Sequence, residues 1–341
     1  MRGDGPRATA CEVSVLVVSF NTRELTLACV ESVEEQTRSI SFETLLVDNA
    51  SCDGSASAIA ARFPRVKVLR LDRNIGFAPA NNVAAERARG EFILLLNPDT
   101  VVLDGAIETL VGFARRRPDA GIWGGRTVFA DGSLNPTSCW GAQSVWSVLC
   151  RGVGLGRVFA GSRLFDPESL GWWGRDTVRE VATITGCFLL IRRDLWDALG
   201  GFDPRFTMYG EEVDLCIRAR RRGARPTFTP DATIIHYGGK SEAVKSDQVV
   251  RQFVARARLM RKHFGPISGR VGVFGLSLWA WNKWLRAALR SRLGRGSSAE
   301  AALWREIVAR RREWRSAYHD PAMARPAPTT PPPAAVVLEG S

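Results

Sequence analysis

VSVLVVSF at residues 13–20 is the stretch that decides the fold. It is a short apolar run rich in β-branched residues, which is typical of a parallel strand buried on both faces. Further strands and helices then alternate along the chain, with strands predicted at 43–47, 66–70 and 92–96 and helices at 24–35, 55–62 and 78–89. Short loops between alternating elements predict an α/β fold, a mostly parallel sheet with helices on both faces.

The remaining elements follow less regularly. We expect a helix at 104–117, a loop-rich stretch from 126 to 180, a strand at 184–191, helices at 194–199 and 211–222, a strand at 233–236 and a helix at 243–264. The predicted organisation has four parts. They are a disordered lead-in at 1–10, one α/β domain at 11–265, a basic, Trp-bearing helical segment at 266–320 and a Pro-rich disordered tail at 321–341.

The net charge of +12 belongs to one part of the chain. Residues 1–250 carry 30 basic and 30 acidic side chains, whereas residues 251–320 carry 16 basic and 4 acidic ones. The seven cysteines form no C-x-x-C pair, and the first residues lack the apolar core of a secretory signal. No apolar run reaches the ~18 residues of a confident membrane span. We therefore expect a cytoplasmic protein.

Polar residues follow three of the predicted strands. They are Ser19 to Asn21, Asp48 with Asn49, and Asn97 to Asp99. A single aspartate after a strand ordinarily forms an Asx turn or caps a helix. Ligands in parallel sheets bind outside the carboxyl ends of the strands. Two aspartates at one edge therefore suit a site in which Asp48 holds a sugar and base, and Asp99 holds Mg²⁺ or Mn²⁺ and a diphosphate.

Three acids stand at the start of a predicted helix, at Glu211, Glu212 and Asp214. Favourable placement in the helix dipole explains one or two acids there. Crowded carboxylates raise each other's pKa, which poises one of them as a general base. His236 ends an apolar strand before two glycines, and it is either a structural residue or a metal ligand. There is no P-loop and no complete dinucleotide-binding glycine motif, which disfavours a nicotinamide dehydrogenase.

Taken in order, eight segments resemble glycosyltransferase family 2 proteins with a GT-A fold, especially the rhamnosyltransferase-like branch. The segments are VVSFN at 17–21, VDNASCDG at 47–54, RNIGFAPANN at 73–82, LNPDT at 96–100, TGCFLLIRR at 185–193, GGFD at 200–203, YGEEVDL at 209–215 and HYGGKS at 236–241. Because they are numerous and occur in the family's order, the resemblance is specific, and it spans about 13–265.

The resemblance implies roles for individual residues. Asp99 would carry most of the metal role, because Asn97 replaces the first Asp of the family's D-x-D motif, and His236 would be a further metal or diphosphate ligand. Glu212 stands at the position of the catalytic base, with Glu211 and Asp214 as alternatives. The implied nucleotide-sugar contacts are Ser19, Phe20, Asn21, Asp48, Asn49, Asp53, Gly76, Phe77, Asn81, Asn82 and Asn97. The implied acceptor contacts are Thr185, Gly186, Tyr209 and Glu211.

The implied activity is a metal-dependent, inverting transfer from a nucleotide diphosphate sugar to a hydroxyl. We favour dTDP-L-rhamnose as donor, Mg²⁺ or Mn²⁺ as cofactor and a polyprenyl-linked glycan of the cell envelope as acceptor. A different UDP- or GDP-sugar and a soluble acceptor form the alternative. A homodimer is left open. A nucleic-acid-binding α/β protein acting through its basic segment is the alternative of another class, although no recognised nucleic-acid-binding fold accompanies that segment.

The basic segment itself predicts contact with a membrane surface. Trp279, Trp281 and Trp284 lie beside apolar residues and arginines at helical spacing. Such a pattern favours an amphipathic helix in the headgroup region, which would place the protein peripherally on the inner face of the cell membrane. The alternatives are a helix that packs on the α/β domain and a solvated basic helix.

Overall fold

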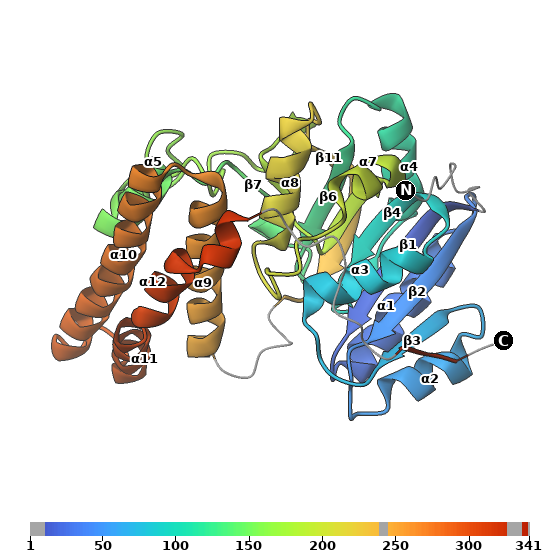
Figure 1. The fold of residues 1–341 in the computed structure, drawn as a ribbon, viewed down its shortest axis with the longest axis horizontal. Coiled ribbons are helices and arrows are strands. Elements are labelled where there is room, and N and C mark those ends of the chain that lie inside the picture. Colours follow the sequence, from blue (N-terminus) through green and yellow to red (C-terminus); the bar gives the residue numbers. More distant parts are fainter. Residues whose placement is uncertain (1–10, 239–244, 326–335, 340–341) are drawn as a thin grey trace.

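The structure, a computed structural model, describes residues 11–238, 245–325 and 336–339. The predicted lead-in at 1–10, the end of the HYGGKS segment and residues 326–335 of the tail lie outside the described residues. Two parts are visible in Figure 1, a sheet covered by helices and a group of C-terminal helices beside it. No helix in the described ranges combines the length and the apolar character needed to cross a bilayer.

A large mixed sheet forms the centre of the first part. Across the sheet the strands are β12 (Val336–Glu339), β3 (Lys67–Leu71), β2 (Phe42–Asp48), β1 (Cys11–Ser19), β4 (Gly90–Leu96), β10 (Phe188–Arg192), β6 (Ile122–Val128), β11 (Thr227–His236) and β5 (Thr100–Val102), with β8 (Arg179–Glu180) paired to β11. Strands β3, β2, β1 and β4 form a parallel block, and β10 runs antiparallel between β4 and β6. The predicted α/β fold with a mostly parallel sheet is confirmed.

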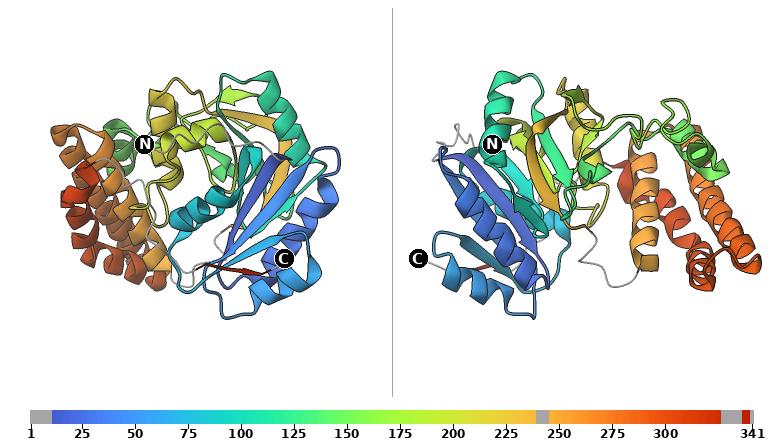
Figure 2. Two further views of the ribbon diagram at one scale, coloured as in Figure 1. Left: turned by 45° about the vertical axis from the view of Figure 1, so that its right-hand side comes forward. Right: turned by 180° about the vertical axis from the view of Figure 1, so that it is seen from behind.

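The alternation of side chains along β1 explains why helices cover both faces. Val15 and Val17 point into one apolar core, and Leu16 and Val18 point into the other. The first core is closed by α1 (Arg23–Gln36), α2 (Ser55–Arg62) and α4 (Ala106–Arg116). The second is closed by α3 (Phe77–Arg87), α7 (Arg193–Leu199) and α8 (Glu211–Arg221). Figure 2 shows the helices on the two faces of the sheet.

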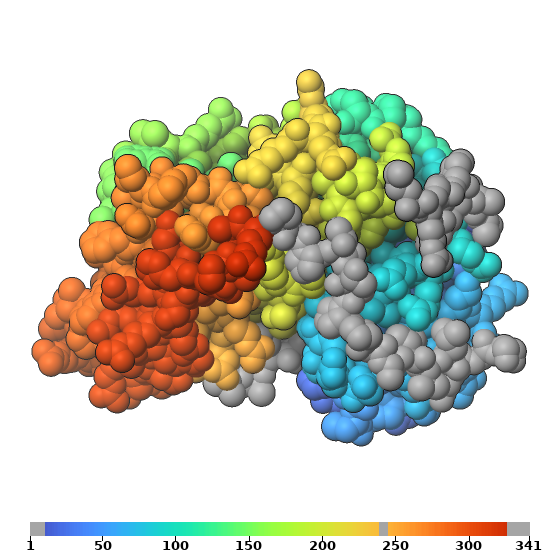
Figure 3. All heavy atoms as spheres, in the orientation of Figure 1, coloured from blue at the N-terminus to red at the C-terminus, as the bar shows by residue number. Residues whose placement is uncertain are grey.

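The second part of the molecule is helical. It consists of α5 (Val145–Val153), α6 (Leu155–Val158), α9 (Lys245–His263), α10 (Pro266–Arg292), α11 (Ser298–Ala309) and α12 (Arg312–His319). An apolar cluster holds these helices together, and Phe253 and Trp314 lie buried in it with their rings edge to face, 5.1 Å between centroids. In Figure 3 the orange and red helices cover one end of the molecule.

Three predictions differ from the structure. The strand predicted at 184–191 is divided into β9 (Thr183–Ile184), which pairs with β7 (Cys139–Trp140), and β10, which joins the main sheet. The loop-rich stretch contains α5, α6 and the short helix η1 (Pro136–Ser138). The tail predicted to be disordered at 321–341 forms the short helix η2 (Pro321–Ala324) and β12, because the edge of β3 offers unpaired backbone groups.

Candidate functional site

The ends of β1 and β2 meet at one edge of the sheet, as the sequence predicts. Ser19 and Asp48 are register partners, and the Asn49 backbone N–H donates to the Ser19 carbonyl at 2.9 Å. The Asn21 side-chain oxygen accepts a backbone N–H from the segment after β2 at 2.8 Å. Phe20 stays 39% exposed. The predicted residues of the two segments are therefore neighbours, and an exposed aromatic ring lies among them.

Asp48 and Asp53 differ in what they bind. Asp48 is buried, and its Oδ2 accepts the Ser51 N–H at 3.3 Å. Burial raises the pKa of Asp48. Asp53 accepts the backbone N–H groups of Arg23 at 2.8 Å and Ser55 at 3.0 Å. The oxygens of Asp53 therefore hold the first turns of α1 and α2, and the fold alone accounts for this residue.

The start of α3 joins this edge to the segment before α8. The Asn49 side-chain amide donates to the Gly76 carbonyl at 3.3 Å, and the Phe77 N–H donates to the Thr207 carbonyl at 2.7 Å. Gly76 has a φ of 90°, and a Cβ there would lie 2.5 Å from the Thr207 oxygen. Only glycine permits this approach. A Cβ on Gly186 would lie 3.4 Å from the Phe77 ring, so the TGCF segment is adjacent too.

The side chains of the two asparagines of α3 form hydrogen bonds with backbone groups of the protein. Asn82 donates to the Phe202 carbonyl at 2.8 Å and accepts the Phe202 N–H at 2.9 Å. The Asn81 amide donates to the Phe77 carbonyl at 3.0 Å and is buried. Asn82 therefore fastens the GGFD segment to α3. The structure gives it a structural task where the sequence predicted a nucleotide contact.

Asp99 and His236 lie together at the ends of β4 and β11. The His236 Nε2 is 3.4 Å from the Asp99 Oδ1, and the Tyr237 N–H donates to the Asp99 carbonyl at 3.0 Å. The Asn97 N–H donates to the Cys187 carbonyl at 3.2 Å. Burial acts to lower the pKa of His236, but the neighbouring Cys187 and the Asp99 carboxylate raise it to about 10.

This pair fits part of the coordination sphere of a divalent cation. A carboxylate oxygen and an imidazole nitrogen suit Mn²⁺ or Mg²⁺, and a diphosphate and water commonly fill the other positions around such cations. No group of three or more His, Cys, Asp or Glu side chains in the described ranges could enclose a metal alone. Asp99 and His236 could therefore supply two ligands of such a site.

Two glutamates begin α8 after a strained turn. Tyr209 and Gly210 both have positive φ, 68° and 84°, so the chain turns sharply just before Glu211. Glu211 is buried. Burial and the negative charge of Glu212 raise the pKa of Glu211, and burial raises the pKa of Glu212. Carboxyl groups with raised pKa values are suited to proton transfer near neutral pH.

Asp214 is an ion-pair partner instead. Its carboxylate lies 2.7 Å from Arg218 Nε, 2.5 Å from Lys262 Nζ and 2.7 Å from His263 Nε2. Burial acts to raise the pKa of Asp214, but these three groups together lower it. Lys262 also binds Asp203 at 2.6 Å. Because its oxygens are engaged, Asp214 is poorly placed to accept a substrate proton, whereas both glutamates remain candidates.

The predicted acceptor contacts lie beside α8. Thr185 donates from Oγ1 to the Thr137 carbonyl at 2.5 Å, and it precedes Gly186 in the link between β9 and β10. Strand β9 packs against α8. The Tyr209 hydroxyl accepts from the Gln248 amide at 3.3 Å. Thr185, Gly186, Tyr209 and Glu211 therefore belong to one region around the start of α8.

Three buried polar atoms of these segments have no hydrogen-bond partner in the described part of the chain. They are Asp48 Oδ1, Glu211 Oε2 and His236 Nδ1. An unpaired buried polar group costs about 1–3 kcal/mol. Each of the three belongs to a different predicted motif, and the contacts above link the motifs. Such a group of open donors and acceptors is expected where a polar ligand binds.

Sequence reasoning missed the contribution of α9. Gln248, Lys262 and His263 reach from α9 to Tyr209 and Asp214, yet α9 was predicted only as a closing helix. The run of Arg, Lys and His at its end is the one signal that could have shown an acidic partner. Cys187, between the TG pair and β10, lies beside His236 and had no signal of its own.

Comparisons with known proteins show the family that the chain resembles. The model of Glycosyl transferase family 2 matches residues 14–171. An N-acetylglucosaminyl-diphospho-decaprenol L-rhamnosyltransferase of Mycobacterium tuberculosis is 31% identical over 211 residues, 58% of this chain and 67% of that protein. The O-antigen biosynthesis protein RfbC of Myxococcus xanthus is 30% identical over 238 residues, 67% of this chain.

The relatives differ in length, and the chain spans only 18% of RfbC. Among solved structures, the mannosyltransferase PcManGT of Pyrobaculum calidifontis, in complex with GDP-Man and Mn²⁺, superposes with a TM-score of 0.53 at 18% identity. The superposition covers 90% of this chain and 86% of that one, which supports the predicted GT-A-like fold. With the mycobacterial relative matched over two thirds of its length, the chain belongs to glycosyltransferase family 2.

Proposed function

We propose that this glycosyltransferase moves a sugar from a nucleotide diphosphate to a hydroxyl of a lipid-linked glycan, in the synthesis of a cell-envelope polysaccharide. The observation that carries the proposal is the set of unpartnered buried atoms on Asp48 and His236, at strand ends, and on Glu211, at the start of α8, with His236 next to Asp99. The name of the mycobacterial relative supports L-rhamnose and a diphospho-polyprenol acceptor, and the name of the myxococcal relative supports a role in polysaccharide synthesis. The favoured donor is dTDP-L-rhamnose.

The donor would lie along the ends of β1, β2 and β4. Asp48 accepts hydrogen bonds from the base or ribose, and Phe20 offers an exposed ring beside it. Asp99 and His236 face the diphosphate and would hold Mg²⁺ or Mn²⁺ there. The cation, when bound, neutralises the charge that develops on the leaving diphosphate.

The acceptor would approach past Thr185, Gly186 and Tyr209 toward the start of α8. Glu212, with its pKa raised by burial, takes the proton of the acceptor hydroxyl. That oxygen then attacks the anomeric carbon from the face opposite the diphosphate. A single displacement inverts the configuration and needs no covalent enzyme intermediate. Glu211 is the alternative base, because it is also buried and has one free oxygen.

Calorimetric titration with dTDP, UDP and GDP, each with and without Mn²⁺, tests the donor. We expect the tightest binding for dTDP and a marked loss without the cation. Transfer is then followed with the matching sugar nucleotide and a short-chain diphospholipid glycan. Preference for UDP or GDP, or transfer to a soluble glycan alone, would replace the rhamnose and lipid parts of the proposal. No nucleotide binding by the folded chain would refute it entirely.

The lipid-linked acceptor also implies where the protein works. We propose a peripheral position on the cytoplasmic face of the cell membrane, since nucleotide sugars are made in the cytoplasm and polyprenyl carriers lie in the bilayer. The basic C-terminal helices supply the charge for such contact. Fractionation of cells with a high-salt wash tests this, and recovery of all protein in the low-salt soluble fraction would contradict it.

A further inference from the structure

One face of α10 is fully committed to packing. A Cβ added to Gly269 would lie 2.6 Å from the Tyr318 hydroxyl, and one added to Gly272 would lie 2.7 Å from the Met260 sulfur. Gly275 approaches Val148 of α5 in the same way, at 3.0 Å. These glycines recur every three residues, so they line one side of the helix. That side is closed by α9, α12 and α5.

The other side of α10 is apolar and exposed. Its residues are spaced by three, four or seven positions and therefore form one stripe along the helix. The exposed fractions are Ile267 77%, Val271 37%, Phe274 64%, Trp281 45%, Leu285 61% and Leu289 55%. A continuous apolar stripe of this length is unusual on a water-facing helix and marks a surface that binds something apolar.

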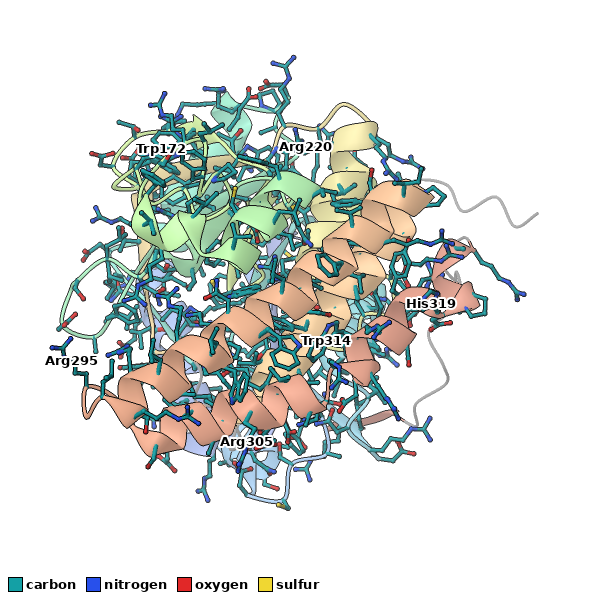
Figure 4. The ribbon with its side chains drawn as sticks, turned by 90° about the vertical axis from the view of Figure 1, so that its left-hand side faces the viewer. Trp172, Arg220, Arg295, Arg305, Trp314 and His319 are labelled. Carbon is teal, nitrogen blue, oxygen red and sulfur yellow. The ribbon has the colours of Figure 1, made fainter. Side chains whose placement is uncertain are left out.

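The neighbouring α5–α6 segment, taken as residues 145–164, extends this surface. Helix α5 packs along α10, and the Asn282 amide donates to the Gly152 carbonyl at 2.9 Å. Figure 4 shows α10 between α5 and α11, which lie along its two flanks. The segment exposes further large apolar residues: Trp146 46%, Val153 54%, Val158 74%, Phe159 47% and Leu164 60%.

The segments that form this surface carry basic side chains and no acidic ones. Residues 248–299 contain eleven Lys and Arg and no Asp or Glu, and residues 132–165 contain three Arg and no acid. Arg157, Arg163, Arg270, Arg292 and Arg295 are exposed. Two copies of the chain meeting through this face would bring like charges together, which opposes self-association. An apolar stripe edged by arginine matches an anionic bilayer, where each Lys or Arg contributes ~1 kcal/mol.

We propose that the exposed stripe of α10, together with the α5–α6 segment, docks on an anionic lipid bilayer. The occupant is a lipid surface with acidic headgroups: the apolar side chains enter the headgroup and upper acyl region, and the arginines bind the phosphates. This deepens the proposed function, because it rests on a lipid-linked acceptor for its purpose. The ion pairs of Lys262 and His263 with Asp214 join α8, which begins with the two candidate bases, to α9, and α10 packs against α9.

The docking face differs from the one that the sequence favoured. Trp279 was expected at the headgroup level with Trp281 and Trp284, but its ring packs tilted against Phe253, with centroids 5.0 Å apart, and Trp314 is fully buried in the same cluster. These two side chains lie in the core of the helical part because large side chains are needed there between α9, α10 and α12. Among the tryptophans of α10, Trp281 is the one that belongs to the exposed stripe.

Flotation of the full-length protein with vesicles tests the proposal. The vesicles are phosphatidylcholine alone, or phosphatidylcholine with phosphatidylglycerol. We expect binding to the mixed vesicles, weakened by high salt and by omitting phosphatidylglycerol. The double variant Phe274→Glu/Leu285→Glu should bind at least ~10-fold more weakly, since each large side chain loses its burial in lipid. Val158→Glu should weaken binding as well. The matched control Phe129→Glu changes an apolar residue of similar exposure, 40%, at the end of β6 and should bind normally.

Each outcome decides the question. Wild-type binding by the double variant would overturn the docking face, and so would tighter binding to duplex or single-stranded DNA than to the vesicles. A wild-type dimer in sedimentation velocity that the double variant abolishes would assign the face to a second copy. Circular dichroism and dTDP affinity, measured on every variant, establish folding. Absence of vesicle binding by the wild type, with its dTDP binding intact, refutes only the lipid surface, whereas absence of nucleotide binding by the wild type refutes only the proposed function.

Discussion

At the level of single residues, the surroundings of Glu211, Glu212 and Asp214 shift the pKa values of these acids in different directions. Asp214 faces Arg218, Lys262 and His263, and these partners keep it ionised. Within the described residues Glu211 and Glu212 have no such basic partners, and burial raises the pKa of each. A carboxylate that must accept a proton needs a free lone pair and a pKa near the working pH. The structure therefore narrows the candidate bases from three to two.

The choice between the two glutamates is testable by isosteric replacement. Glu212→Gln keeps the shape but cannot accept a proton, so we expect transfer to slow by ~10²–10⁴-fold. Donor affinity should remain within about twofold, because the change leaves the ends of β1, β2 and β4 intact. Transfer rates and dTDP titration measure the two effects. If Glu211→Gln shows the large loss and Glu212→Gln does not, the base is Glu211.

Asp99 should control the cation dependence of nucleotide binding. In the proposed site Asp99 supplies the main hard oxygen ligand, so in Asp99→Ala adding Mn²⁺ should no longer tighten the binding of dTDP, and turnover should be abolished. Calorimetry with and without Mn²⁺ measures this. Asp131→Ala, which changes an aspartate of an exposed turn, is the control. A cation response of wild-type size in Asp99→Ala would move the metal site elsewhere.

At the level of elements, α8 and α9 are joined by a buried ionic cluster. Asp214 on α8 binds Lys262 and His263 on α9, and Lys262 also binds Asp203. Removing one partner from such a cluster leaves the other charges buried and unpaired, which costs about 3–5 kcal/mol. The cluster therefore sets the position of the α8 turn, which holds both candidate bases, relative to the C-terminal helices.

Asp214→Asn should accordingly lower the free energy of unfolding by about 3 kcal/mol at pH 7. The folded state lowers the pKa of Asp214. Its contribution is thus fully present above the ordinary aspartate pKa of about 3.9 and is lost as the pH falls toward the folded value. Urea unfolding of wild type and variant at several pH values measures the difference. A gap that stays constant down to pH 3 would contradict the ionic account.

Which elements could be predicted from sequence follows from how they are stabilised. Strands β1, β2 and β4 can be predicted from sequence, because burial on both faces requires continuous apolar runs. The sequence of β6, IWGGRTV, does not predict a strand, because Gly124 and Gly125 interrupt its apolar run. The two glycines are needed there because their missing side chains leave room for Ile184 and Phe188. Strand β12 is set by the edge of β3, a tertiary contact that no local pattern records.

The site divides in the same way. Asp48, Asp99, His236 and the glutamates were predictable, since strand ends and helix starts carry recognisable polar clusters. The tasks of Asp53 and Asn82 were not, because both bind backbone groups that only the folded chain brings near. Lys262 and His263 reach Asp214 from 48 or more residues away in the chain, a separation no spacing rule covers.

At the level of the whole molecule, the C-terminal helices act as a second core. Phe253 and Met260 of α9 are covered by α10 and α12, and Val148 of α5 is covered by α10. The sequence allowed this packing as one alternative to a membrane helix, and in the structure one face of α10 packs while the other stays open. A deletion of these helices therefore removes core contacts together with any membrane contact.

Truncation after Gly265 should destabilise the protein for this reason. It would expose the large side chains of α9 and α5 to water, and each such side chain contributes ~1.5–3 kcal/mol when buried. A loss of about 5 kcal/mol corresponds to a melting temperature lower by about 10–20 °C. Differential scanning calorimetry measures it, with truncation after Arg325, which removes no helix, as the control. If the truncated chain has the same melting temperature as the control, the helical core does not stabilise the α/β part. Vesicle release by the short chain could then be read directly as loss of the docking face.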